Sequence, residues 1–169
     1  MHINDDHLYH GAALTQIAEW PSFKAINAFE TKKGEKSRSC FIVNHDTGIY
    51  LKYATKPIGT FKEFVFTFTE ANLSELNVLK AHHARVFIVL VCRKAEEICV
   101  LTEAEFETHR QGRENEKGAK EPHYQLLVTM PKGKSFRVYM NAPGVKKTAL
   151  KNQIVSRNEF PRALFNGTA

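Results

Sequence analysis

The run Val86–Cys92 (VFIVLVC) constrains the fold more than any other segment, because none of its side chains is charged or strongly polar. It has the length of a strand, and a strand that is apolar on both sides has to be covered on both faces. Glu97–Leu101 (EICVL) follows across the polar turn Arg93–Glu96 and is its expected neighbour. This pair predicts a sheet at the centre of the domain with other elements packed on it.

Other strands are expected from alternation and from β-branched or aromatic content. Ile49–Ala54 alternates, which places Ile49, Leu51 and Tyr53 on one face and Tyr50 and Lys52 on the other. The remaining expected strands are Phe41–Val43, Phe64–Thr69, Tyr124–Met130 and Phe136–Met140, of which the last two are joined by the turn Pro131–Lys134.

Three helices are expected from apolar spacing and capping residues. The first ends near Trp20, before Pro21, and a short helical continuation follows it. The second begins after Thr69 as N-cap, and the third begins at the capping box formed by Thr102 and Glu105. The apolar stripes are Leu8, Ala12, Ala13 and Ile17 in the first helix, Phe23, Ile26 and Phe29 in its continuation, and Leu73, Leu76 and Leu79 in the second.

Two polar segments read as loops, Glu30–Ser39 and residues 111–122, and the second is long enough to be mobile. A length of 169 residues suits one domain with a real core. We therefore predict a single domain over residues 1–169, of the α+β or α/β class, with a single mixed β-sheet and helices packed on it. A C-terminal β-hairpin and a basic tail follow this core. Ile49–Ala54, Phe64–Thr69 and Val86–Cys92 are expected in one sheet, under the leucine-striped helix.

The order helix, three strands, helix, strand over roughly residues 5–110 resembles the core of the restriction-endonuclease-like, or PD-(D/E)XK, superfamily. The resemblance implies a carboxylate on one strand and a D/E-x-K motif on the next, converging on a divalent metal and its water. Tyr50-Leu51-Lys52 occupies the motif position, so Lys52 matches and Tyr50 replaces the carboxylate. Asp46 is the candidate first acid.

The resemblance implies Mg²⁺ as cofactor if the chain is a nuclease, and no other cofactor is predicted. One carboxylate makes a weak Mg²⁺ site unless substrate phosphates and another acid complete it. Glu19, Glu30 or Glu63 could supply that acid. Asp46 and Lys52 are thus the candidate catalytic residues, with a structural or solvated role as the alternative. Because Tyr50 replaces the carboxylate, we expect no robust nuclease activity.

Basic residues are concentrated in the C-terminal segment, residues 131–169. This segment carries a net charge of +7, whereas residues 1–130 carry −1. Such asymmetry indicates an anionic partner, with a merely soluble surface as the alternative. In Phe136–Met140, Arg137 and Tyr139 alternate with apolar residues, so one face could offer a cation and a stacking ring. The candidate nucleic-acid-binding residues are Lys132, Lys134, Arg137, Tyr139, Lys146, Lys147, Lys151 and Arg157; Arg162 is a further cation of the segment.

Other features bound the class of protein. Cys40, Cys92 and Cys99 form no C-x-x-C pair, and the two latter are expected as small core residues. No apolar run approaches the roughly 18–20 residues that cross a bilayer. The N-terminus lacks the positive start and apolar core of a signal peptide. These features predict a soluble, cytoplasmic protein that does not bind a membrane.

Two classes of function remain open beside a metal-dependent nuclease with a displaced carboxylate. The preferred prediction is nucleic-acid association on a nuclease-like scaffold. The alternative is a protein-interaction or assembly module whose tail contacts an acidic protein partner. The sequence does not distinguish DNA from RNA, and it gives no oligomeric state.

Overall fold

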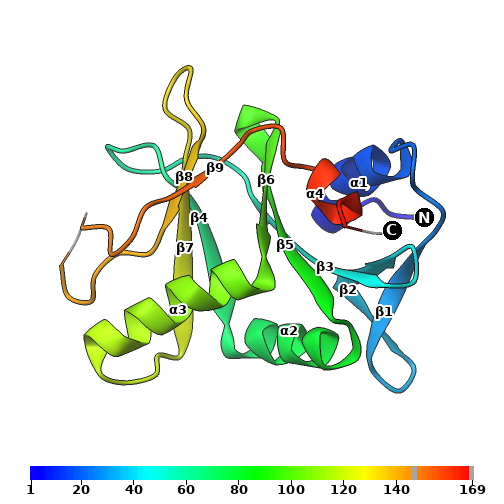
Figure 1. The fold of residues 1–169 in the computed structure, drawn as a ribbon, viewed down its shortest axis with the longest axis horizontal. Helices are drawn as coiled ribbons and strands as arrows, with labels where there is room; N and C mark the ends of the chain where they lie inside the picture. Colours follow the sequence, from blue (N-terminus) through cyan, green and yellow to red (C-terminus); the bar gives the residue numbers. More distant parts are fainter. Residues whose placement is uncertain (146–147, 168–169) are drawn as a thin grey trace.

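The strands form two sheets, where the sequence predicted one (Figure 1). The computed structural model describes residues 1–145 and 148–167. It confirms the α+β class. In chain order the elements are α1 (Asp5–Ala18), β1 (Ile26–Lys32), β2 (Glu35–Val43), β3 (Thr47–Ala54), β4 (Phe64–Thr69), α2 (Glu70–His82), β5 (Arg85–Cys92), the 3₁₀ turn η1 (Arg93–Ala95), β6 (Glu97–Thr102), α3 (Glu103–Lys117), β7 (His123–Thr129), β8 (Phe136–Tyr139), β9 (Gln153–Val155) and α4 (Arg162–Phe165).

The first sheet has five strands in the order β1-β2-β3-β5-β6. β3 and β5 are parallel, in register from Thr47↔Arg85 to Ala54↔Cys92, and the other pairs are antiparallel. Every residue of β5 after Arg85 is buried. The prediction that this run is a central strand covered on both faces is therefore confirmed.

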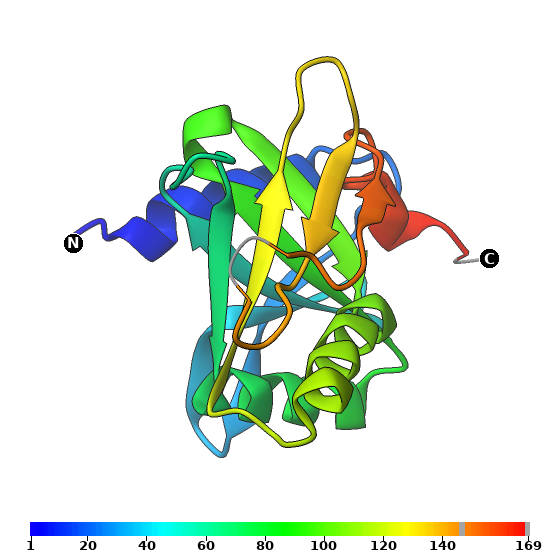
Figure 2. The same ribbon diagram turned by 90° about the vertical axis from the view of Figure 1, so that its left-hand side faces the viewer.

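β4 lies outside this sheet, so the prediction that Phe64–Thr69 joins Ile49–Ala54 and Val86–Cys92 in one sheet is wrong. It pairs with β7 in a second, antiparallel sheet of order β4-β7-β8-β9 (Figure 2). Phe64, Phe66 and Phe68 alternate along β4 and are all buried in the core between the sheets. A strand whose apolar residues alternate needs to be covered on one face only. β4 meets this condition at the edge of the second sheet, because its phenylalanine face packs into the core between the sheets.

The N-terminal part also differs from the sequence prediction. Ile26 and Phe29 belong to β1 and not to a helical continuation, and most of Glu30–Ser39 forms the β1–β2 hairpin and not a loop. Gly34 has φ +80° in the turn, a conformation that glycine adopts readily. The alternating charges of this hairpin are exposed on a strand pair, which explains why the segment lacks large apolar residues.

Residues 111–117 continue α3, so the prediction of a loop over residues 111–122 is wrong for that part. Arg110 forms ion pairs with Glu107 and Glu114, one turn before and after it. Such i,i+3 and i,i+4 pairs stabilise a helix that has little apolar surface. The helix ends at Gly118, whose φ of +75° forms the C-cap.

The five-stranded sheet separates two apolar cores. α1 and α4 cover one face, where Ile17 and Leu164 pack with Ile49 and Val89. α2, α3 and the second sheet cover the other, which contains all three cysteines. The prediction that Cys92 and Cys99 are core residues is confirmed, and Cys40 is buried with them. In the described residues, no helix combines the length and apolarity needed to cross a membrane.

Candidate nucleic-acid interface

Lys52 lies in a partly buried polar cluster between β3 and α2. Strand alternation places Tyr50 and Lys52 on the same face of β3, as predicted, with Ile49 and Leu51 on the other. The Lys52 Nζ donates to Asn72 Oδ1 at 2.9 Å and lies 5.0 Å from the centre of the Phe68 ring. The same Asn72 oxygen accepts from the backbone N–H of Thr69 as part of the α2 capping box. Lys52 is thus tied to the start of α2.

The acid of this cluster is Glu75, which the sequence prediction missed. Its Oε2 accepts from Ser37 Oγ at 3.1 Å and lies 3.7 Å from Cys40 Sγ. Asn72, Glu75, Leu76 and Leu79 follow the i, i+3, i+4, i+7 spacing of one helix face. The presence of two polar residues, Asn72 and Glu75, on the helix face that packs on the sheet is the sequence signal that would have predicted this cluster.

Burial sets the ionisation of these groups. It lowers the pKa of Lys52, against the opposing effect of the Glu75 carboxylate. Burial likewise raises the pKa of the Tyr50 hydroxyl, and it raises the pKa of the Cys40 thiol to about 12. Tyr50 and Cys40 are therefore neutral at physiological pH, and Cys40 is not a thiolate nucleophile.

Asp46 does not meet Lys52. It lies in the turn before β3, where its Oδ1 accepts from Thr47 Oγ1, whereas Lys52 is near the other end of the strand. Six residues of strand separate them by about 20 Å. The pairing of these two residues in one metal site is therefore excluded by the geometry of β3.

The other acids considered from sequence are also elsewhere. Glu19 is the C-cap residue of α1, Glu30 lies opposite Lys36 in the register of the β1–β2 hairpin, and Glu63 accepts from the Tyr139 hydroxyl. Within residues 1–145 and 148–167, no three metal-binding side chains gather at one point. Among the described residues, Glu75 is the one acid that forms hydrogen bonds within this polar cluster. The cluster therefore offers a single carboxylate, and such a set of ligands fits a Mg²⁺ ion poorly.

The basic C-terminal segment contributes to a cavity of about 840 Å³ at one end of the two sheets. Three of the predicted nucleic-acid-binding residues line it, namely Arg137, Tyr139 and Arg157. Its other walls come from the loop before β4, from η1 and the start of β6, and from the end of β7. The loop that follows β3 thus connects the Lys52 strand directly to this cavity.

The structure assigns different surroundings to these three side chains. Arg137 is half-buried in the cavity wall. Tyr139 is buried, with its hydroxyl bonded to Glu63, so the expected open stacking ring is not present. Arg157 donates to the carbonyls of Lys134 and Pro131 and to Glu97. Its donors therefore hold the β7–β8 turn in place.

The remaining predicted cations are distributed around this region. Lys132 and Lys134 are exposed in the β7–β8 turn, and Lys151 is exposed before β9. Lys146 and Lys147 lie outside the described residues.

Two cavity cations were missed from sequence, the exposed Lys62 and Lys94. Lys62 belongs to residues 55–62 (TKPIGTFK), which contain two lysines and no acid. The net charge of residues 1–130 concealed this local excess, because acids elsewhere balance it. The basic face, defined here as Lys62, Lys94, Lys132, Lys134 and Arg137, therefore comes from three separate segments of the chain.

Comparison of the chain with protein-family models, curated protein sequences and solved structures found no match.

Proposed function

We propose that this protein associates with nucleic acid through the basic face. The observation that carries the proposal is the convergence of Lys62, Lys94 and Arg137 on one cavity, beside the exposed lysines of the β7–β8 turn. Lysine and arginine neutralise phosphates and release counterions, which supplies most of the affinity for a nucleic-acid backbone. Phe61, which is 53% exposed, lies beside Lys62 and adds apolar surface to the cavity.

The arrangement of the first sheet supports a nuclease-like scaffold as part of this proposal. α1, then β1 to β3, then α2 and β5 follow the order helix, three strands, helix, strand. The strands of this series lie in one sheet with the two helices on opposite faces. β2 and β3 contain two of the three expected strands. The third expected strand, Phe64–Thr69, is β4 of the second sheet, and β1 is the additional strand of the series. Lys52 lies on β3, in the segment Tyr50-Leu51-Lys52 that the resemblance matches to the D/E-x-K motif.

Catalysis is not part of the proposal. Tyr50 is 1% exposed and neutral, so it cannot replace a metal-binding carboxylate. Glu75 already accepts hydrogen bonds from Ser37 and Cys40. The cluster around Lys52 therefore has the composition of a structural site.

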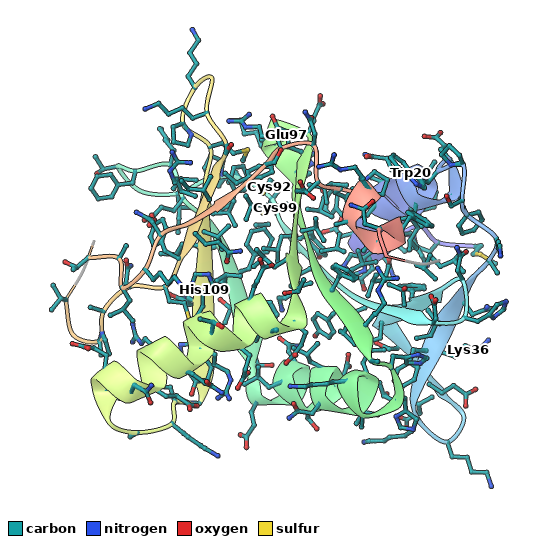
Figure 3. The ribbon with its side chains drawn as sticks, viewed as in Figure 1. Trp20, Lys36, Cys92, Glu97, Cys99 and His109 are labelled. Carbon is teal, nitrogen blue, oxygen red and sulfur yellow. The ribbon has the colours of Figure 1, made fainter. Side chains whose placement is uncertain are left out.

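Fluorescence anisotropy with labelled single-stranded DNA, duplex DNA and RNA tests the proposal. We expect salt-dependent binding by the wild type. The triple variant Lys62→Ala/Lys94→Ala/Arg137→Ala should bind more weakly, with a slope of log K against log salt that is flatter by about 2 for single strands. The matched control is Lys24→Ala/Lys33→Ala/Lys36→Ala, which removes the same charge from exposed positions; Lys36 lies far from the cavity residue Glu97 (Figure 3).

Two outcomes would contradict the proposal. The first is no binding of any of these nucleic acids at tens of micromolar protein. The second is equal weakening by the two triple variants, because net charge alone would then explain the affinity. Either result would favour an acidic protein as the partner of the basic face.

A further inference from the structure

The cavity is large enough to hold a small organic ligand, and not only a phosphate group. Its volume of about 840 Å³ lies within the range of roughly 300–1,000 Å³ that is usual for pockets of small organic ligands. Most of the surface of its walls is apolar, with Pro57, Phe61 and Met130 among the lining residues, although polar and charged residues are more numerous. This composition suits a flat ring system more than a bare anion.

Two residues of the wall each have a buried acceptor atom that lacks a hydrogen-bond donor within the described residues. Glu97 Oε1 accepts from Arg157 at 2.6 Å, but Glu97 Oε2 is buried and no donor reaches it within the described residues. Asn141 Oδ1 is also buried, and no donor of the described residues reaches it. Both residues line the cavity. A buried acceptor without a donor is unfavourable. The Glu97 side chain as a whole is partly exposed, so a rotation of its carboxylate would present the unsatisfied oxygen to an N–H group of a ligand.

Arg157 is bonded to Glu97, whereas the other cations that line the cavity are accessible to solvent. Lys62 and Lys94 are exposed, and Arg137 is half-buried beside them. A ligand that satisfies the whole site therefore carries a negative group toward solvent and N–H donors toward Glu97. A nucleotide whose base has an exocyclic amino group has both features, whereas uracil has a carbonyl oxygen where cytosine has its amino group.

Resting on the proposed function, we propose that the cavity accepts one unstacked nucleotide and prefers an amino-bearing base such as cytosine over uracil. The phosphate contacts Lys62, Lys94 and Arg137, and the amino group donates to the Glu97 carboxylate. The site is selective because uracil would place an acceptor against a carboxylate that already lacks a donor. The cost of extruding the base is lowest where the nucleotide is unpaired.

The test compares labelled duplexes that contain one unpaired cytosine, one unpaired uracil or one abasic site, by anisotropy at near-physiological salt. We expect the cytosine duplex to bind about tenfold more tightly than the uracil duplex, which corresponds to about 1.4 kcal/mol. The preference should disappear in Glu97→Gln, because an amide offers a donor as well as an acceptor. Thermal unfolding confirms that this variant is folded despite the lost ion pair with Arg157.

A cavity-filling variant provides a second test that leaves every charge in place. Ala149 lines the cavity and is exposed, so Ala149→Trp should fill it and bring the three affinities together. Ala119→Trp, on the exposed turn after α3, is the matched control and should behave as the wild type.

The outcomes separate this inference from the proposed function. If the wild type binds all three duplexes equally and Ala149→Trp changes nothing, the cavity does not accept a base. In that case, weaker nucleic-acid binding by the variant that lacks Lys62, Lys94 and Arg137 would still support the proposed function. If the wild type binds no strand, the proposed function is wrong. Calorimetry with free cytidine and uridine monophosphates then decides the inference: a preference for the cytidine compound that Ala149→Trp removes supports it, and binding of neither overturns it.

Discussion

Tyr50 and Lys52 show how much a single strand pattern can predict at the residue scale. Alternation along β3 predicted that they share a face, and both contact the core between β3 and α2. The acid whose charge acts on both of them, Glu75, lies more than twenty residues further along the chain. No local pattern links it to Lys52, because their proximity depends on how α2 packs on the sheet. Asp46, the nearest acid in sequence, lies at the wrong end of the strand.

The composition of this cluster predicts the result of a nuclease assay. Plasmid and single-stranded DNA incubated with Mg²⁺ or Mn²⁺ should remain uncut, because neutral Tyr50 replaces the carboxylate that a metal-dependent nuclease needs. Lys52→Ala serves as the control for contaminating nucleases. Cleavage by the wild type that Lys52→Ala abolishes would show that this prediction is wrong.

Two buried histidines predict the pH dependence of stability. Burial lowers the pKa of His10 and of His109, although each has a hydrogen-bond partner, the Arg38 carbonyl and the Gln153 side chain. The two histidines therefore bind protons more strongly in the unfolded chain than in the folded one. The free energy of unfolding should consequently fall as the pH drops below about 6.5. The slope cannot exceed about 1.4 kcal/mol per pH unit for each histidine.

Urea unfolding between pH 7.5 and 5.5 measures this dependence, at pH values above the ordinary range of carboxyl groups. His109→Gln should flatten the curve, and His45→Gln, at an exposed position, should leave it unchanged. A curve that rises as the pH falls would contradict the assignment of buried neutral histidines.

At the scale of elements, the largest errors of sequence interpretation fall on segments with few apolar residues. The β1–β2 hairpin and the second half of α3 were both interpreted as loops. The hairpin is held by backbone pairing at the edge of the sheet, and α3 by ion pairs along its surface. Neither interaction requires a large apolar side chain, so hydrophobic periodicity does not detect them. The elements with strong apolar patterns, β3, β5 and α2, lie where the sequence predicted them.

Two glycines of α3 test its extent by effects of opposite sign. Gly112 lies in the helix with open space around the position of a Cβ atom, so Gly112→Ala should stabilise the protein by about 0.5–1 kcal/mol. Gly118 forms the C-cap with positive φ, so Gly118→Ala should destabilise it by about 1 kcal/mol. Chemical denaturation measures both. Equal, near-zero effects would indicate a flexible segment in place of the helix.

At the scale of the whole molecule, the division into two sheets is what the sequence could not predict. Phe64–Thr69 has the pattern of a strand in either sheet, and its pairing with β7 joins segments about sixty residues apart. That pairing brings the loop before β4 beside the C-terminal strands. Lys62 consequently lies with Arg137 on one cavity. The charge count predicted that the C-terminal segment is basic, but not that its cations meet others from the first half of the chain.

The most direct test of the proposed basic face is an NMR titration of the ¹⁵N-labelled protein with a short single-stranded DNA. The backbone amides of Lys62, Lys94 and Arg137 and of the β7–β8 turn should shift progressively. Those of Lys33 and Lys36, in the β1–β2 hairpin, should not. Shifts confined to that hairpin, or no shifts at a molar excess of DNA, would contradict the assignment of nucleic-acid binding to the basic face.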